Sequence, residues 1–243
     1  MSESLTILAT TALVLGLTHT LIGPDHYLPF IVLGRAEKWS LKRTLLWTFL
    51  CGLGHVGSSV LIGSLGILLG WSLAGMEGFE SIRGTVASVS LMGFGGVYML
   101  WGLYRAIKGR AHQHAHPHLH ADGSVHDHLH RHSSDHHHTH ADEGDTASAH
   151  RRTFWAVFIV FVLGPCEPLI PLLMVPASEH SVWGMALVTA VFAIATISVM
   201  MITVVLGYLG VGLIRLAPIE RYVHAFSGGA ILTSGLLIQL FGI

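Results

Sequence analysis

The chain has 243 residues, of which 51% are hydrophobic and only 11% are Asp, Glu, Lys or Arg. A soluble domain usually carries about 25% charged residues, so this composition argues against a soluble protein. The formal net charge of −1 gives no indication of nucleic-acid binding, and two isolated cysteines, Cys51 and Cys166, do not make a disulfide framework.

Six apolar segments follow one another along the chain, several of them as long as the roughly 20 residues that a bilayer-spanning helix needs. They cover residues 5–33, 44–70, 84–104, 154–177, 183–214 and 222–242. The first segment lacks a basic leader and a clear cleavage site, so we expect a retained helix rather than a signal peptide. The sequence therefore predicts an all-α integral membrane protein with about six transmembrane helices.

The connection between the third and fourth segments is polar and holds fourteen of the nineteen histidines. Such a composition cannot bury a core, so we expect this loop to be disordered without metal. The predicted organisation is a first three-helix unit at 1–106, a histidine-rich loop at 107–153 and a second three-helix unit at 154–243.

Basic residues predict the orientation of these helices. Twelve of the thirteen Lys and Arg residues follow the first, third and fifth segments, and only Arg83 falls on the other side. By the positive-inside rule, both termini lie outside and the histidine-rich loop lies in the cytoplasm. We therefore expect a multi-pass protein of the cell inner membrane.

A weak internal repeat relates the two three-helix units. Residues 21–28 and 162–169 each contain Gly-Pro, two functional side chains, a spacer and Leu. The third and sixth segments share a glycine spacing, with Gly95-Gly96 and Gly102 in one and Gly228-Gly229 and Gly235 in the other. An odd number of helices per unit gives the units opposite topology. The sequence thus predicts a 3+3 inverted repeat with interrupted first and fourth helices, a known transporter design.

Carboxylates are rare in the apolar segments. Of the fourteen acidic residues, the predicted segments contain only Asp25 and Glu167, one beside each Gly-Pro break. A charge in lipid is costly and usually marks an ion path, although either carboxylate could instead cap free backbone groups at a helix break.

Histidines accompany Asp25. His19 and His26 are separated by two helical turns, and Pro24 interrupts the helix between them. His55 lies about 18 Å along its helix from Arg43, well inside a bilayer core. We expect His19, Asp25, His26 and His55 to converge, since imidazole suits Ni, Co, Cu and Zn. Binding needs neutral histidine and should weaken as the pH falls.

The second break and the loop offer further candidate ligands. Glu167 is a candidate, and Cys166 could either ligate as a thiolate or simply pack. His180 and His224 are predicted to be interfacial rather than ligands. Histidine-rich tracts bind metal by composition, although a solvated linker that tolerates histidine would look the same. The candidate loop ligands are His112, His114, His116, His118, His120, His136, His137 and His138.

Together these motifs resemble the nickel/cobalt transporter superfamily. The resemblance rests on His-x5-Asp-His in the first segment, Leu-Gly-His-x-x-Ser around His55, Gly-Pro-Cys-Glu-Pro around Glu167, and the histidine-rich loop. It is greatest for six-helix NicO, UreH-like and HupE/UreJ-like members. The eight-helix nickel permeases resemble this chain less, because they place four residues, not five, between the first histidine and the Asp-His pair.

The resemblance implies transport of Ni²⁺ or Co²⁺, with Zn²⁺ allowed, through His19, Asp25, His26 and more weakly His55. It leaves the direction open, since efflux members carry such a cytoplasmic loop whereas UreH-like members are associated with nickel supply to urease. We expect no enzyme activity and no tightly bound cofactor. The partners are the metal ion and the bilayer, and a cytoplasmic metallochaperone and an oligomer are compatible with this interpretation.

Three alternatives stay open at the level of sequence. A membrane thiol-disulfide carrier would use Cys51 and Cys166. A metal sensor or chaperone subunit would bind the ion without moving it. A transporter of a small organic or anionic solute in the same superfamily would not depend on His19.

Overall fold

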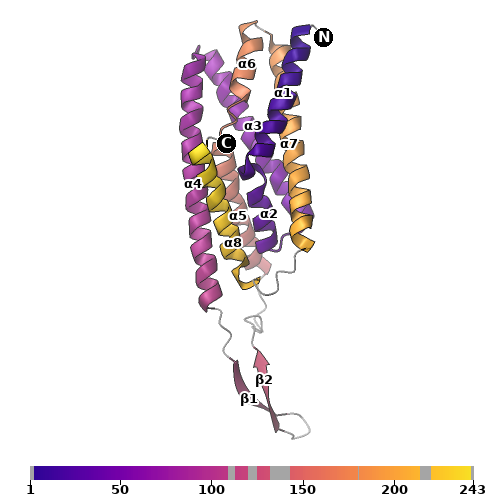
Figure 1. The fold of residues 1–243 in the computed structure, drawn as a ribbon, viewed down its shortest axis with the longest axis vertical. Coiled ribbons are helices and arrows are strands. Elements are labelled where there is room, and N and C mark those ends of the chain that lie inside the picture. Colours follow the sequence, from indigo (N-terminus) through magenta and orange to yellow (C-terminus); the bar gives the residue numbers. More distant parts are fainter. Residues whose placement is uncertain are drawn as a thin grey trace.

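Figure 1 shows the computed structural model of the protein, which describes residues 3–108, 113–119, 125–131, 143–179, 181–213 and 220–241. The helices are α1 (Glu3–Ile22), α2 (Leu28–Ala36), α3 (Leu41–Leu68), α4 (Leu73–Lys108), α5 (Glu143–Leu163), α6 (Leu169–Ser178), α7 (Val182–Leu213) and α8 (Val223–Phe241). Two short 3-10 helices, η1 (Pro24–His26) and η2 (Glu220–Tyr222), and two strands, β1 (Gln113–Leu119) and β2 (Val125–Arg131), complete the described elements.

Within this described part, five helices are long and apolar enough to cross a membrane. They are Glu3–Ile22, Leu41–Leu68, Leu73–Lys108, Val182–Gly212 and Glu220–Phe241. The fourth predicted segment instead forms two shorter apolar helices, Thr153–Leu163 and Leu169–Ser178. Large apolar side chains such as Leu61, Ile194 and Leu206 face outward from the bundle, as in a multi-pass membrane protein.

The first apolar segment is broken where Gly-Pro occurs. α1 ends at Ile22, Gly23 is extended, and η1 begins at Pro24. A Cβ on Gly23 would come within 2.6 Å of His26 Nδ1 and 2.8 Å of Asp25 Oδ1. The break therefore needs glycine here, because any larger residue would displace the two side chains that follow.

The fourth segment is broken at the matching place. α5 ends at Leu163 and α6 begins at Leu169, with Pro165 and Pro168 between them. Proline lacks the N–H that a continuing helix would use. In Figure 1, α1 lies above α2 and α6 lies above α5, so both breaks lie near mid-height of the bundle.

Two hydrophobic clusters lie on either side of these breaks. One includes Phe30, Phe161, Met200 and Ile231, and the other includes Leu169, Leu173, Val188 and Phe192. The breaks thus lie between two packed apolar regions, which hold their irregular backbone in place.

The helix boundaries differ from the predicted segments in two places. α4 begins at Leu73 rather than near residue 84, because Glu80 and Arg83 do not end it, and α5 begins at Glu143 rather than near residue 154. In the predicted loop, β1 and β2 pair antiparallel, with Gln113 opposite Arg131. The side chains of 109–152 lie outside the described residues, so the disorder of this loop stays a prediction.

Candidate metal centre

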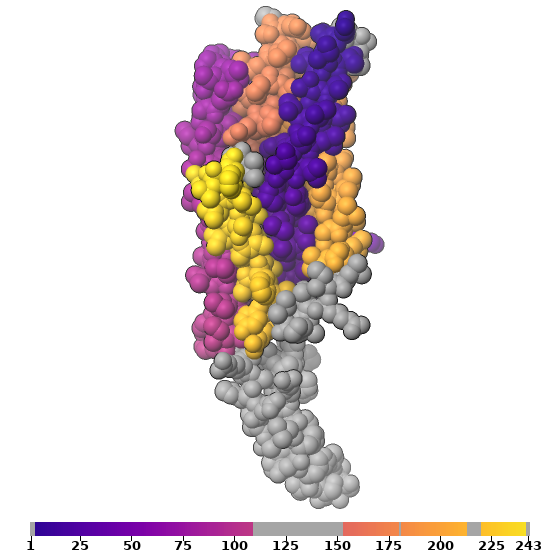
Figure 2. Space-filling view, in the orientation of Figure 1, coloured from indigo at the N-terminus to yellow at the C-terminus, as the bar shows by residue number. Residues whose placement is uncertain are grey.

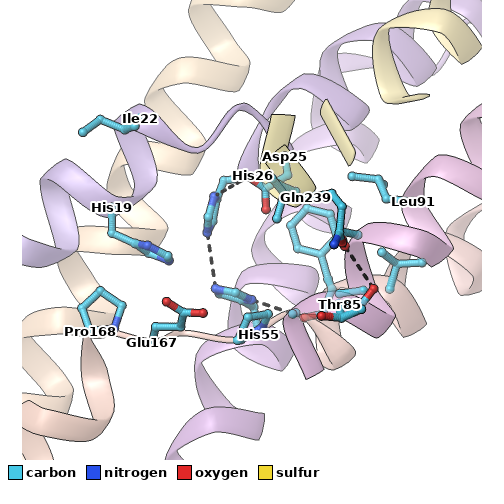
Figure 3. Close-up of a pocket in the computed structure, with 18 of the residues that line it drawn as sticks. His19, Ile22, Asp25, His26, His55, Thr85, Leu91, Glu167, Pro168 and Gln239 are labelled. Atoms are coloured by element: carbon cyan, nitrogen blue, oxygen red, sulfur yellow. Dashed lines mark hydrogen bonds and ion pairs between the residues drawn. The ribbon is translucent and has the colours of Figure 1, made fainter. Parts of the chain in front are cut away.

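Three histidines from three elements meet at the first helix break. His19 lies in the last turn of α1, His26 in η1 and His55 in the middle of α3. One ring nitrogen of each lies within 4.8 Å of the others. The ring of His26 lies 4.7 Å from that of His19 and 5.0 Å from that of His55, centroid to centroid. Figure 3 shows the three rings facing a common space.

The environment of His26 fixes which of its nitrogens carries the proton. Nδ1 lies 3.1 Å from the Gly23 carbonyl oxygen and 3.2 Å from Asp25 Oδ1. Both partners are acceptors, so Nδ1 carries the hydrogen and donates it. In the neutral ring, Nε2 is left with its lone pair.

His55 has the same arrangement. Its Nδ1 lies 3.3 Å from the Phe161 carbonyl oxygen at the end of α5, so it donates there and Nε2 keeps a lone pair. The Nε2 atoms of His26 and His55 lie 3.4 Å apart. Two lone pairs at this distance repel unless a proton or a metal cation lies between them. Two nitrogens ~2.1 Å from a tetrahedrally coordinated ion would themselves lie about 3.4 Å apart.

His19 completes the group from the other side. It is half-buried, and its Nε2 lies 3.9 Å from Cys166 Sγ. Cys166 has no exposed surface, and its backbone N–H donates to Ser59 Oγ at 3.2 Å. The thiol therefore lies at the edge of the histidine group, where it can either pack or ligate.

The two predicted carboxylates have different positions. Asp25 contacts His26 Nδ1 rather than sharing the space between the ring nitrogens, so it would act on a bound ion through His26. Glu167, in the second break, is exposed and lines the same cavity as the three histidines.

This cavity has a volume of about 510 Å³. Its walls come from α1, η1, α3, α4, α5, the second break and the last turns of α8. Ser88 of α4 donates to Gln239 of α8 at 2.6 Å on one wall. In Figure 2 the end of α8 lies at mid-height of the bundle, and α6 is visible above it between α4 and α1.

A buried ion pair next to the site was missed in the sequence. Glu80 and Arg83 of α4 are 1% and 7% exposed and form a salt bridge. From the sequence we expected Asp25 and Glu167 to be the acidic residues of the apolar segments and Arg83 to lie in an outer connection, whereas Glu80 and Arg83 both lie inside the long apolar helix α4. The i, i+3 spacing of opposite charges beside a long apolar helix could have indicated the pair.

Arg83 connects the second break to α3. Its guanidinium donates to the carbonyl oxygens of Val162 at 3.0 Å and Gly164 at 3.2 Å, which the break leaves without helical partners. It also donates to Ser58 Oγ at 2.9 Å and Ser59 Oγ at 3.3 Å. His55 lies one turn before these serines, so Arg83 holds the break against the helix that carries His55.

The remaining candidates lie elsewhere. His224 lies in the first turn of α8, where Tyr98 Oη lies 2.8 Å from its Nδ1 and donates to Glu37 Oε1 at 2.6 Å. Cys51 is buried among apolar side chains. His180 and the side chains of the loop histidines lie outside the described residues.

No protein-family model matches the chain, and neither a curated protein nor a solved structure matches it. The motifs of the sequence and the geometry of the residues are therefore the basis for any functional proposal.

Proposed function

We propose that this protein moves a divalent transition-metal cation across a bilayer through a site formed by His19, His26 and His55, with nickel or cobalt as the first candidates. The observation that carries the proposal is the pair of facing Nε2 atoms, 3.4 Å apart, of two buried histidines whose Nδ1 atoms donate elsewhere. Imidazole nitrogen is a ligand for nickel, copper, iron and zinc. Nickel and cobalt come first because of the sequence resemblance.

We further propose that the chain consists of two inverted three-helix units, in each of which the interrupted helix (α1 with α2, or α5 with α6) counts as one. The operation that relates the units places α1 on α5, α2 on α6, α3 on α7 and α4 on α8. The packing supports this correspondence. α1 packs on α7 as α5 packs on α3, and α2 packs on α8 as α6 packs on α4. The α1–α2 and α5–α6 pairs also run in opposite directions along the bundle (Figure 1).

Glycines on α4 and α8 give residue-level support. A Cβ on Gly102 would meet the Ala225 backbone, with Cα at 2.9 Å, and a Cβ on Gly235 would meet the Met92 backbone nitrogen at 2.9 Å. The sequence separation between Gly102 and Gly235 equals the separation between Met92 and Ala225. The two contacts are therefore the same contact with the helices exchanged.

This architecture suits ion transport. Interrupted helices that meet near the middle of a bilayer leave backbone carbonyls and polar side chains free to bind an ion, and inverted units allow the site to face either side in turn. A divalent cation that enters an inside-negative cell gains about 4.6 kcal/mol per 100 mV. Inward movement therefore needs only a gated path, whereas efflux needs coupling to another gradient.

For the cellular setting, we propose the inner membrane, with both termini outside and the histidine-rich segment in the cytoplasm. The excess of Lys and Arg after the odd-numbered apolar segments supports this orientation. In that position, the segment would gather metal at the cytoplasmic end of the path.

The test is flux in proteoliposomes that contain a metal-sensitive dye, with Ni²⁺, Co²⁺, Zn²⁺ and Mn²⁺ offered separately under a defined pH gradient. We expect flux for wild type and for the His224→Ala control, and none for His55→Ala with an unchanged elution volume. Equal flux in His55→Ala would refute the site, and no flux of any metal in wild type would favour a non-transporting sensor.

The thiol-disulfide alternative has a separate test. Cys51 and Cys166 are free and have no exposed surface, and they belong to different apolar clusters. A thiol in redox exchange must be reached by its partner. We expect metal flux to be retained when both cysteines are replaced by serine.

A further inference from the structure

A second cavity lies beside the histidine cavity and is lined by carboxylates. It has a volume of about 500 Å³ and is lined by Glu77, Glu80, Ser81, Glu167, Pro168, Ile170 and Pro171. Ser81, Glu167 and Pro168 also line the histidine cavity. The two spaces thus adjoin at these three residues, of which Glu167, the acidic residue of the second helix break, is labelled in Figure 3.

Glu80 is the buried member of this acidic group. It is 1% exposed, and one carboxylate oxygen, Oε1, accepts from Arg83. The other oxygen, Oε2, is buried and has no hydrogen-bond partner in the part of the chain that the structure describes. A buried carboxylate oxygen without a partner is costly. The ion pair with Arg83 uses Oε1, which leaves Oε2 available for a further partner beside the cavity.

The charges in this cavity favour a divalent ion. Three carboxylates, those of Glu77, Glu80 and Glu167, line the cavity, and the Arg83 guanidinium forms a salt bridge with Glu80, which leaves two formal negative charges. One divalent cation would neutralise them. Carboxylate and water ligands suit hard cations such as Mn²⁺ and keep a transition metal partly hydrated, whereas imidazole holds it more tightly.

The acidic residues of this cavity lie in order between one end of the bundle and the histidines. Glu77 is exposed and lies one turn closer than Glu80 to the start of α4, at the end of the bundle where α1 also begins. Glu167 lies at the other side of the cavity, next to the histidines. An ion could therefore pass from Glu77 to Glu80 and Glu167 and then to His19, His26 and His55.

We propose that Glu77, Glu80 and Glu167 form a second divalent-cation site, distinct from the three histidines and adjoining them. The inference that an ion occupies this site during transport rests on the proposed function, whereas the inference that the site binds a divalent cation does not. The site differs from the histidine centre in chemistry because its ligands are oxygen atoms.

Mn²⁺ is the probe for this site, because its electron spin echo modulation reveals nitrogen ligands. The full-length protein in detergent is titrated with Mn²⁺ alone. We expect one bound population without nitrogen coupling, which Glu80→Gln and Glu167→Gln remove and His55→Ala retains. Glu179→Gln is the matched control, because Glu179 is an exposed acid just after α6 that lines neither cavity.

Glu77→Gln and Glu167→Gln keep the test decisive if Glu80→Gln does not fold, because both side chains are exposed. A nitrogen-free signal of equal amplitude in these variants would overturn the proposal, as would Mn²⁺ bound only with nitrogen coupling. If the Gln variants lose the nitrogen-free signal but wild type shows no metal flux, the acidic site stands and the transport function is refuted. If wild type shows metal flux but binds no Mn²⁺ without nitrogen coupling, the transport function stands and the acidic site is refuted.

Discussion

At the scale of single residues, His26 uses its two ring nitrogens for different purposes. Nδ1 is held by the Gly23 carbonyl and by Asp25, and Nε2 faces His55. A carboxylate next to the far nitrogen of a histidine ligand fixes its tautomer and raises its basicity. We therefore expect Asp25 to strengthen metal binding even though its oxygens lie outside the group of ring nitrogens.

Asp25→Asn should keep the size of the side chain and remove its charge. Partners of this kind typically contribute 10–100-fold to metal affinity, so we expect the half-saturation concentration for Ni²⁺ flux to rise by about that factor. Glu179→Gln serves as the control. A half-saturation concentration equal to that of wild type would mean that the Asp25 charge does not act on the ion.

At the scale of elements, α4 and α8 pack backbone against backbone. A Cβ on Gly95 would come within 2.8 Å of the Gly228 carbonyl oxygen and 2.9 Å of Leu232 Cα. In a membrane, small residues at such positions allow helices to approach closely enough for extensive van der Waals contact. The adjacent Gly96 has no atom within 4 Å of its ideal Cβ.

This contrast makes Gly95→Ala and Gly96→Ala a matched pair. We expect Gly95→Ala to lower the free energy of unfolding by about 1–3 kcal/mol, because backbone cannot move aside as a flexible side chain can. Gly96→Ala should be neutral or stabilise by up to about 1 kcal/mol through helix propensity. Thermal unfolding in detergent measures both, and equal melting temperatures would contradict the close packing.

Arg83 fixes the second break to its neighbours, so its loss should affect both folding and transport. Removing one partner of a buried ion pair typically costs about 3–5 kcal/mol, and we expect Arg83→Gln to lose stability on this scale and to abolish flux. Arg105→Gln is the control, since Arg105 is exposed and lies over Trp101 at the other end of α4. An Arg83→Gln variant with wild-type stability would show that the two carbonyls find other donors.

At the scale of the whole molecule, two apolar clusters enclose a polar centre between two helix breaks. Apolar side chains pack on either side of the polar centre along the bundle, among them Phe192 in one cluster and Phe161 in the other. The residues that line the histidine cavity lie in α1, η1, α3, α4, α5, the second break and α8, so we expect metal flux not to depend on the histidine-rich segment.

Deletion of residues 112–140 should therefore leave metal flux in proteoliposomes and change its apparent affinity or regulation. The expected result is a shifted half-saturation concentration with a maximal rate close to that of wild type. Complete loss of flux in a correctly inserted deletion variant would show that the segment forms part of the path.

Local features of the sequence determined a large part of this protein. Long apolar runs predict membrane helices because their length and composition are local properties, and the Gly-Pro pairs at 23–24 and 164–165 predict the breaks because proline cannot continue a helix. The histidines and Asp25 were identified because polar groups are costly in an apolar segment.

Only the tertiary structure decided how these groups face one another. The hydrogen bond from His55 to the Phe161 carbonyl and the contact of Arg83 with Val162 join residues far apart in sequence, and they depend on how α3, α4 and α5 are rotated against one another. Helix rotation is set by side-chain packing over the whole bundle, which no local pattern contains. For the same reason, the burial of Glu80 beside a cavity became visible only when α4 was placed against the second break.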